Sequence, residues 1–487
     1  MRPNSRPIST LGLGLLLLAL SPATAADLAP LDSHEEDVRA VRVRDVSSEI
    51  DRYKAESVLM QRSLLAGTPM PGTLSDYLVW DKGGQSDATN TAPCTVPVAP
   101  TDLCPPSNRN YTVCPSGCNY SNIQTAINSV PLGSNIRVLR RPTAYEPYQV
   151  GNLLVNRRVN LIAEDVGERE WVVRLQTAAT GYGIHITADS ACLRGFRIDH
   201  MSANPAIRIV GSTTAARRLV KVARNAIDTT NDPAPQGATG IELFGTDGST
   251  LLENRIIGDK DNMGIHFEGD LGNKNNVVWS NVISGYSRGI VLNAGAFTSY
   301  SLPMSFNTIA WNHIRHASDG IFSWSMSLGG FGTANVADNL YYMNTITEPA
   351  GSDASGVWLL GTSRERVCSQ TISGPWIGVA MDSSGFAPVS DANKVSDCFI
   401  RASHWAIAVG PGSNNGVFQV NNLATSRVAG SYNAAWAFIQ NGGSHTIAAG
   451  EGHSNECWMY FDQTPSPRIT MTNDPREIDN DFELCIN

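Results

Sequence analysis

The chain has 487 residues, a formal net charge of −9 and a charged fraction of 17%. A chain of this length can bury a large apolar core. The negative balance argues against nucleic acid or an anionic membrane surface as a partner, and it mildly disfavours a polyanionic substrate.

The first 25 residues have the three parts of a secretory signal peptide. Arg2 and Arg6 supply the positive start, Leu11 to Leu20 the apolar core, and Ala23-Thr24-Ala25 the small residues before a cleavage site. The apolar core is too short to span a membrane. Residues 1–25 are therefore predicted to be removed, leaving a secreted protein, periplasmic or extracellular, with no membrane segment.

Residues 26–112 are predicted to form an N-terminal helical extension and a Cys-containing linker. Apolar residues follow Ser48 at helical spacing as far as Leu64, and Gly67 and Pro69 end that pattern. Residues 81–112 are rich in Thr, Pro, Asn, Asp and Ser, as linkers are. We favour a tethered extension; packing on the rest of the chain or on a partner is the alternative.

A repeat runs through the centre of the chain. One apolar residue per repeat serves as its marker, at steps of 29, 29, 27, 31, 32, 26, 28 and 23 residues: Ile198, Ile227, Ile256, Ile283, Ile314, Ile346, Ile372, Ile400 and Leu423. Each repeat holds short segments of period 2 and none of helical period, which is typical of one turn of a parallel β-helix. The predicted fold is all-β, a single-stranded right-handed parallel β-helix of about nine to eleven coils over residues 113–447, with residues 448–487 as a C-terminal cap.

A turn position two residues before most markers is usually Asn. It is occupied by Asn225, Asn254, Asn281, Asn312, Asn344 and Asn421, with Phe196, Gln370 and Cys398 as exceptions. Asn tolerates the left-handed backbone of a tight corner. Stacked Asn amides can also bond one coil to the next, so an Asn ladder is predicted.

The pattern resembles the right-handed parallel β-helix of the pectin-lyase-like superfamily over roughly residues 113–445. The stretch SNIQTAINSVP from Ser121, with Ile123, Ile127 and Val130 on one face, resembles the helix that caps the first coil in those proteins. The segment from Ile136 to Asp165 is similar to the opening strands of pectin methylesterases. The catalytic motifs of methylesterases, polygalacturonases and alginate epimerases have no counterparts, so the resemblance implies the fold and not an activity.

Nine cysteines leave at least one unpaired within the chain. We predict that Cys94–Cys104, Cys114–Cys118 and Cys457–Cys485 are bonded, because these pairs close loops outside the repeat. Cys192, Cys368 and Cys398 lie within coils and are predicted to be small buried residues.

One strand of each coil presents a predicted outward face. Its first column is His185, Arg208, Glu242, His266, Val291, Phe322, Trp358, Ala380 and Ala408, and its second is Thr187, Val210, Phe244, Glu268, Asn293, Trp324, Leu360 and Asp382. Titratable groups beside aromatic rings are what a glycan site needs, since carboxylates and histidines move protons and flat rings cover sugar faces.

The predicted catalytic residues are Glu242, Glu268, His266 and Arg208. Two carboxylates one coil and two residues apart lie about 8 Å from each other, which suits an inverting hydrolase. Arg208 is expected to keep Glu242 ionised as the base, with Glu268 as the acid and His266 beside Glu242. The predicted substrate-binding residues are His185, Phe322, Trp324 and Trp358.

The same residues also have purely structural interpretations. Arg208 and Glu242 can be a cross-strand ion pair, and loops can cover the aromatic rings. An acidic run is formed by Asp259, Asp261, Glu268 and Asp270, whose oxygen atoms are ligands of the kind that Ca²⁺ prefers. Such a run is more often a solvated loop, and neither a metal nor a cofactor is expected.

Three classes of function fit these observations. The first is a secreted polysaccharide-degrading enzyme, either a glycoside hydrolase or a polysaccharide lyase. The second is a glycan-binding or adhesive protein, and the third is a structural protein of the cell surface. The expected partner is an extracellular polysaccharide or cell-surface glycan, bound by a monomer.

Overall fold

The structure is a computed structural model. It describes residues 94–101, 104–143, 146–164, 171–211, 217–231, 237–269, 271–294, 303–328, 332–347, 354–383, 389–425, 434–439, 443–453, 457–462, 468–471 and 484–486. The predicted signal peptide, the predicted helix after Ser48 and the rest of residues 1–93 lie outside this part of the chain. Among the described residues, no helix is long and apolar enough to cross a membrane.

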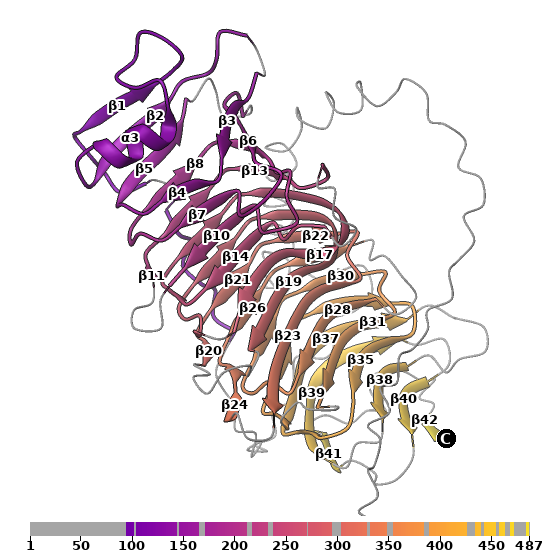
Figure 1. Ribbon diagram of the computed structural model, residues 1–487. Helices are drawn as coiled ribbons and strands as arrows, with labels where there is room; N and C mark the ends of the chain where they lie inside the picture. The colour runs from indigo at the N-terminus through magenta and orange to yellow at the C-terminus, as the bar shows by residue number, and fades with distance from the viewer. Residues whose placement is uncertain are drawn as a thin grey trace, which may run out of the picture. The chain divides into compact units, whose positions relative to one another are not determined.

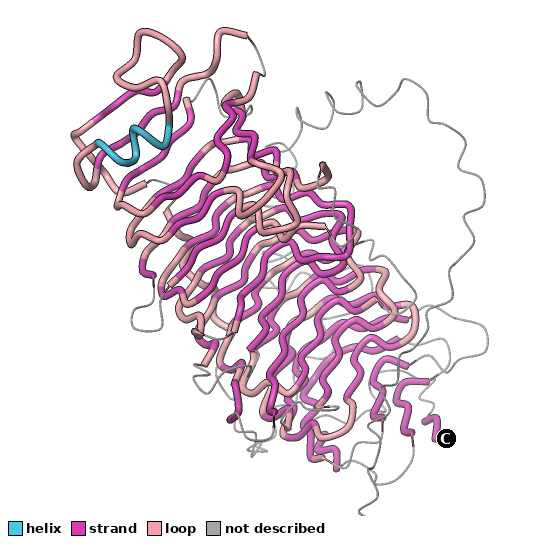
Figure 2. The backbone as a smooth tube through the Cα atoms, in the orientation of Figure 1, coloured by secondary structure: helices cyan, strands magenta, loops and turns pink. Residues whose placement is uncertain are grey.

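The described chain forms a right-handed parallel β-helix of about 10 turns, as predicted. Strands of successive coils lie side by side along the stack (Figure 1), and strands dominate the backbone (Figure 2). Each coil contributes to three faces. Along the chain a face 1 strand is followed by a face 2 strand, and the Asn turn then leads from face 2 to face 3.

The strands of each face pair in parallel with the equivalent strands of the next coil. Face 1 carries the predicted site and comprises β4 (Leu153–Val155), β7 (Ile184–Ile186), β10 (Ile207–Val210), β14 (Ile241–Phe244), the ends of β17 (Arg255–Glu268) and β19 (Val282–Ala294), β23 (Asp319–Leu328), β28 (Ser355–Leu360), β31 (Ile377–Asp382), β35 (Trp405–Val409), β38 (Ala434–Ile439), β40 (Cys457–Asp462) and β42 (Leu484–Ile486).

Face 2 comprises β1 (Asn110–Val113), β2 (Ser134–Val138), β5 (Val159–Ala163), β8 (Cys192–Arg194), β12 (Lys221–Ala223), β16 (Thr250–Leu252), β18 (Val277–Trp279), β21 (Thr308–Ala310), β26 (Leu340–Tyr342), β29 (Arg366–Cys368), β33 (Lys394–Ser396), β41 (Arg468–Met471) and the starts of β37 (Gly416–Thr425) and β39 (Ser444–His453). Face 3 comprises β3 (Tyr148–Gly151), β6 (Arg174–Thr177), β9 (Arg197–Asp199), β13 (Ala226–Asp228), β22 (His313–Arg315), β27 (Thr345–Thr347), β30 (Thr371–Ser373), β34 (Phe399–Ala402) and the remaining parts of β17, β19, β37 and β39.

Short strands also pair outside these faces. They are β11 (Arg217–Arg218) with β15 (Thr246–Asp247), β20 (Met304–Ser305) with β25 (Val336–Ala337), β32 (Ser390–Asp391) with β36 (Ser413–Asn414), and β24 (Gly332–Ala334), which pairs antiparallel with the end of β23.

The repeat markers lie in one register on face 3. Ile227 pairs with both Ile198 and Ile256, and the pairing continues without a break to Leu423. These side chains are buried in the core that the three faces enclose. Because each coil leaves its backbone groups unpaired above and below, stacking of identical positions satisfies them and fixes the register of all three faces.

The predicted Asn ladder is confirmed. The backbone N–H and side-chain amide of Asn225 both donate to Asn254 Oδ1, at 3.0 and 3.1 Å, and the same pair of bonds recurs through Asn281 and Asn312 to Asn344. Phe196, Gln370 and Cys398 lie in the same column.

The prediction that these Asn residues adopt the left-handed backbone is wrong. The residue before each one does so instead: φ is 53° at Arg224, Glu253 and Ser280. The corner and the ladder therefore use neighbouring positions, since the Asn must keep its amide aligned with the next coil while its predecessor makes the bend.

A second ladder, which was not predicted, precedes face 2. Asn276 donates to Asn307, and Asn307 to Asn339, with bonds of 2.9 to 3.0 Å. Asn339 in turn donates to Glu365, a fully buried carboxyl that also accepts from Tyr341 Oη at 2.5 Å. Burial raises the pKa of Glu365 to about 7.

The one helix of the described residues, α3 (Ile123–Ser129), covers the first coil. Asn122 caps the start of this helix, because its side chain accepts a hydrogen bond from Thr125 N at 2.9 Å. Ile123 and Ile127 are buried in the core as expected of an apolar plug.

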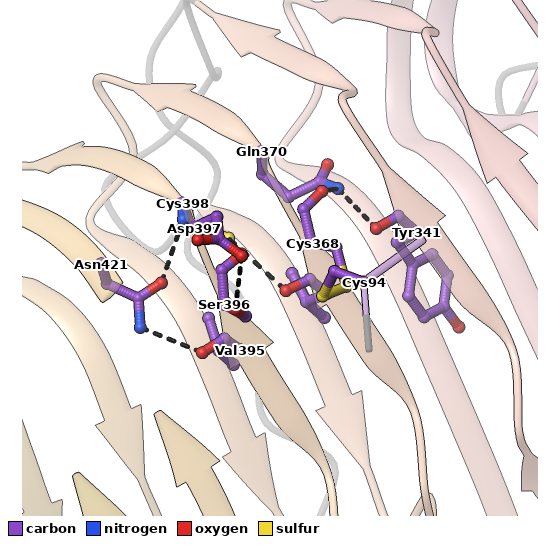
Figure 3. The surroundings of a disulfide bond; sticks show 10 residues. Cys94, Tyr341, Cys368, Gln370, Val395, Ser396, Asp397, Cys398 and Asn421 are labelled. Atoms are coloured by element: carbon purple, nitrogen blue, oxygen red, sulfur yellow. Dashed lines mark hydrogen bonds between the residues drawn. A yellow bond between two sulfur atoms is a disulfide. The ribbon is translucent and has the colours of Figure 1, made fainter. Parts of the chain in front are cut away.

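The cysteine predictions are partly wrong. Cys114–Cys118 is bonded as predicted, but Cys94 is bonded to Cys368 (Figure 3) and Cys104 to Cys192. Both coil cysteines are buried but paired, because a segment that precedes the coils returns along them. Cys398 is buried and free, as predicted. The side chains of Cys457 and Cys485 lie outside the described part, so that pair stays a prediction.

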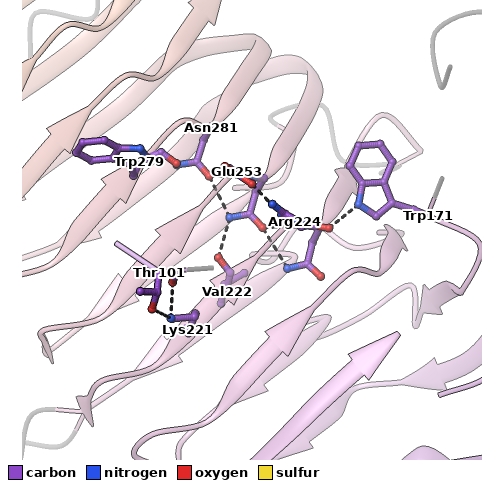
Figure 4. Close-up of polar contacts among 10 residues, drawn as sticks. Thr101, Trp171, Lys221, Val222, Arg224, Glu253, Trp279 and Asn281 are labelled. Atoms are coloured by element: carbon purple, nitrogen blue, oxygen red, sulfur yellow. Dashed lines mark hydrogen bonds and ion pairs between the residues drawn. The ribbon is translucent and has the colours of Figure 1, made fainter. Parts of the chain in front are cut away.

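Residues 94–101 form a strap on the outside of face 2. The six coil steps from Cys368 back to Cys192 span about 29 Å, a distance that the ten residues from Cys94 to Cys104 can reach, since ten extended residues span about 33 Å. Lys221 Nζ donates to Thr101 O at 2.6 Å (Figure 4), and Cys94 packs against an outward apolar cluster that includes Trp279 and Tyr342. The predicted linker is therefore fixed to the β-helix from Cys94 onward.

Parallel pairing continues past residue 447. β40 pairs with β38, β42 with β40 and β41 with β39. The stretch predicted as a C-terminal cap thus carries strands in register with the coils.

Candidate functional site

The two predicted outward columns of face 1 are in register. His185 pairs with Arg208, Arg208 with Glu242, and Glu242 with His266, and this first column continues through Val291 and Phe322 to Trp358. In the second column Phe244 pairs with Glu268, which pairs with Asn293 and then Trp324. The inward column that precedes the first outward column is fully buried, from Ile207 to Ile407. All eight predicted site residues therefore lie on one face of neighbouring coils.

Arg208 is held in place on three sides. Its Nε lies 2.5 Å from Glu242 Oε1, and its guanidinium lies 4.5 Å from the centre of the Tyr182 ring and 5.3 Å from that of Phe244. It also contacts the Tyr182 hydroxyl. The cross-strand ion pair weighed from the sequence is therefore present, and Arg208 is committed to it.

The pKa of Glu242 is shifted in the direction opposite to the one expected from Arg208 alone. Burial raises the pKa of this carboxyl, and the opposing effect of Arg208 is smaller. The physical reason is that the Glu242 side chain is only 12% exposed, so loss of hydration costs the charged form more than one cation restores. Glu242 is thus better suited to hold a proton than the expected role of base requires.

His266 lies between the two carboxylates. It pairs in register with Glu242, and its Nε2 is 3.3 Å from Glu268 Oε2. Burial, followed by Arg288 and Arg208, lowers the pKa of His266 to about 4. The imidazole is therefore neutral at neutral pH. With its proton on Nε2 it can donate a hydrogen bond to the Glu268 carboxylate, whose side chain is 25% exposed.

Arg288 and Asp319 belong to the same face but were not predicted. Arg288 Nε lies 3.2 Å from Asp319 Oδ2, and its guanidinium lies 4.5 Å from the centre of the Phe322 ring. Burial raises the pKa of Asp319 against the effect of Arg288. The sequence did contain a signal for these two residues, because each stands two places before the inward residue of its strand, Ile290 or Ile321. The two predicted outward columns began only after those inward residues and therefore left this position out.

The three aromatic residues form one cluster. Trp358 packs edge-on against Phe322 with ring centres 5.2 Å apart, and Trp324 lies 6.1 Å from Phe322. Phe322 is only 4% exposed, so it supports the other two rings and offers no free face to a sugar. Trp324 and Trp358 are half-buried and retain accessible surface.

Several buried polar atoms on this face have no hydrogen-bond partner among the described residues. They are His185 Nε2, Asn293 Oδ1 and Trp358 Nε1. Buried polar groups are nearly always hydrogen-bonded in folded proteins. These three atoms are themselves buried, so a ligand would contact them only if the side chains that cover them move.

The acidic run, at which no metal is expected, is described only in part. Asp259 is exposed, whereas the side chains of Asp261 and Asp270 lie outside the described part. Among the residues that the structure describes, no group of three or more His, Cys, Asp or Glu side chains is placed to hold a metal ion.

No protein-family model and no curated protein matches the sequence. Solved structures do match. DFA-IIIase from Arthrobacter chlorophenolicus A6, without its lid, is 13% identical over 78% of this chain and 99% of that chain, with a TM-score of 0.47. The catalytic unit of the GH87 alpha-1,3-glucanase from Streptomyces thermodiastaticus strain HF3-3 is 13% identical over 72% of this chain, with a TM-score of 0.44, and this chain spans 64% of its length.

The surface adhesin PfbA of Streptococcus pneumoniae is 10% identical over 71% of this chain and 88% of that chain, with a TM-score of 0.40. At these identities the likeness concerns architecture alone, and enzymes and an adhesin share it. The parallel strand pairing described above confirms the predicted fold: the chain is a parallel β-helix protein.

Proposed function

We propose that face 1 binds a glycan chain and hydrolyses it, with Glu242 and Glu268 as the reacting carboxyl groups. The observation that carries this proposal is the register, which aligns two carboxyls, a neutral histidine and two half-buried indoles on neighbouring coils. Glu242 and Glu268 are one coil and two residues apart, or about 8 Å between Cβ atoms. That separation suits inversion with a water molecule on one side of the sugar.

The environments of the two carboxyls assign their roles. Glu242 is the more buried, and its raised pKa favours the acid that protonates the leaving oxygen. Glu268 is the more exposed, and His266 Nε2 lies within reach to orient it as the base that takes a proton from water. Trp324 and Trp358 would cover sugar faces two to four coils further along.

A glycan-binding protein without catalysis is the second candidate. It is favoured by the 2.5 Å contact between Arg208 and Glu242, because a carboxyl committed to a clamped arginine is less available to donate a proton. Binding would then depend on Trp324 and Trp358 and not on either carboxyl.

Export is part of the proposal. Three disulfides are described, and such bonds persist in oxidising compartments. Together with the predicted signal peptide at residues 1–25, they support a secreted protein.

A polysaccharide panel assayed for new reducing ends and for unsaturated products tests the chemistry. On a substrate that is cleaved, Glu242→Gln and Glu268→Gln are each expected to lower turnover at least 100-fold while binding persists. Glu253→Gln is the matched control. Glu253 lies outside face 1, and its carboxylate pairs with Arg224 Nε at a distance of 2.8 Å. Full turnover by either face 1 variant would refute the site, unsaturated products would establish a lyase, and binding without cleavage would favour the second candidate.

A further inference from the structure

We propose, on the basis of the proposed function, that face 1 takes an uncharged polysaccharide and not a polyuronate. A polyuronate carries a carboxylate on every sugar, and each one brought onto a partly dehydrated face needs a cation or several strong donors to replace its water. The charged groups described on face 1 can be examined one by one for that capacity.

Both described arginines of this face are already engaged by a carboxyl group of the protein. Arg208 pairs with Glu242 at 2.5 Å and lies between two aromatic rings. Arg288 pairs with Asp319 at 3.2 Å and covers the Phe322 ring. Since the partner carboxyls are 12% and 11% exposed, releasing either arginine to a substrate would leave a buried carboxylate uncompensated.

The histidines do not supply the missing charge. Burial and Arg208 lower the pKa of His185, and burial lowers that of His266 to about 4. Both rings are therefore neutral at the pH of most extracellular fluids. They can offer hydrogen bonds to hydroxyl groups but not a countercharge.

The described charges of the face sum to a negative value. Two arginines stand against Glu268, Asp319 and Asp382, a balance of −1, which becomes −2 when Glu242 is ionised. A polyanion would thus meet net repulsion at face 1, whereas hydroxyl groups would meet the half-buried indole rings of Trp324 and Trp358.

This charge pattern also bears on the reaction class. A lyase must neutralise the uronate carboxylate so that the proton beside it can be removed, and no free cation is described on face 1 for that task. An inverting hydrolysis requires two carboxyls and water, with no anionic substrate group. The uncharged substrate and the hydrolytic reaction therefore follow from the same residues.

The test uses matched polymers: neutral glucans and mannans, and the same polymers oxidised at C6 to uronates, so that linkage is unchanged within each pair. The full-length secreted protein is expected to bind the neutral member at least 10-fold more tightly at 20 mM NaCl. The ratio is expected to shrink at 500 mM NaCl, because salt screens repulsion between exposed charges. Equal or tighter binding of the oxidised member would overturn the inference and leave the proposed function standing. Absence of binding to every polymer, neutral and acidic, would instead count against the proposed function.

A second test uses a variant in which an arginine of face 1 loses its carboxylate partner and should gain affinity for the oxidised polymer. Asp319→Asn releases Arg288 and is expected to shift the binding ratio toward the oxidised polymer at least threefold. Asp338→Asn is the matched control, because Asp338 pairs with Arg364 at 2.7 Å at a corner outside face 1, and its ratio should equal that of the unmodified protein. An unchanged ratio in Asp319→Asn, in protein with an unaltered melting temperature, would show that the Arg288–Asp319 pair does not set the discrimination.

Discussion

Removal of the Cys94–Cys368 bond is expected to cost far more stability than removal of Cys114–Cys118. In the chain-entropy model, a bond restricts the unfolded chain more as the loop that it closes grows. The two bonds close separations of 274 and 4 residues, which correspond to about 5 and about 2 kcal/mol. Cys104–Cys192 shortens the chain path between Cys94 and Cys368, but the dependence is logarithmic and the figure changes little.

The assay compares Cys94→Ser/Cys368→Ser with Cys114→Ser/Cys118→Ser in urea, with indole fluorescence as the signal. The expected difference in the free energy of unfolding is about 3 kcal/mol. Mass spectrometry of unreduced peptides checks the pairing in the parent protein. A peptide that links Cys94 to Cys104 would refute the strap, and an equal loss of stability in the two variants would refute the loop-closure reasoning.

Two further predictions concern the buried ladders. Asn281→Ala removes the acceptor of two Asn254 donors, at 2.9 and 3.0 Å, and is expected to lower the free energy of unfolding by about 2–4 kcal/mol. The control Asn128→Ala, on the exposed side of α3, should change that free energy little. Equal effects of the two variants would show that the ladder bonds contribute no net stability. Glu365 has a folded pKa of about 7, above its ordinary value of 4.5, so the folded state retains a proton that the unfolded chain releases, and stability should fall as pH rises from about 4.5 through about 7. Glu365→Gln is expected to flatten that part of the pH profile of the melting temperature, and an unchanged slope would assign the dependence to another group.

The sequence predicted the backbone arrangement because coil stacking repeats the same contacts. A residue such as Ile283 can lie over Ile256 only if the whole coil between them closes, so the spacing of apolar markers determined the register of face 1 as well as face 3. The second ladder had a comparable signal that was missed: Asn276, Asn307 and Asn339 each stand five residues before a member of the first ladder.

Features that depend on contacts between coils and non-repeating segments were not predictable in this way. Cys94 and Cys104 appeared to be natural partners because nothing in their spacing shows that the strap runs along six coils. The burial of Phe322 depends on how Trp358 and Arg288 pack over it, and the protonation of Glu242 depends on its lost hydration. Periodicity identifies which side chains point outward but not which of them are covered.

The strap also imposes an order on biosynthesis. Cys94 is synthesised long before Cys368, and the two can meet only after the intervening coils have stacked, so an early part of the chain is among the last to be fixed. Until then, Cys94 and Cys104 are ten residues apart on an unanchored segment and are each other's nearest partners for oxidation. Correct maturation therefore requires either slow oxidation or an activity that reshuffles disulfides, and completion of the Cys94–Cys368 bond would report that the coils up to β29 have assembled.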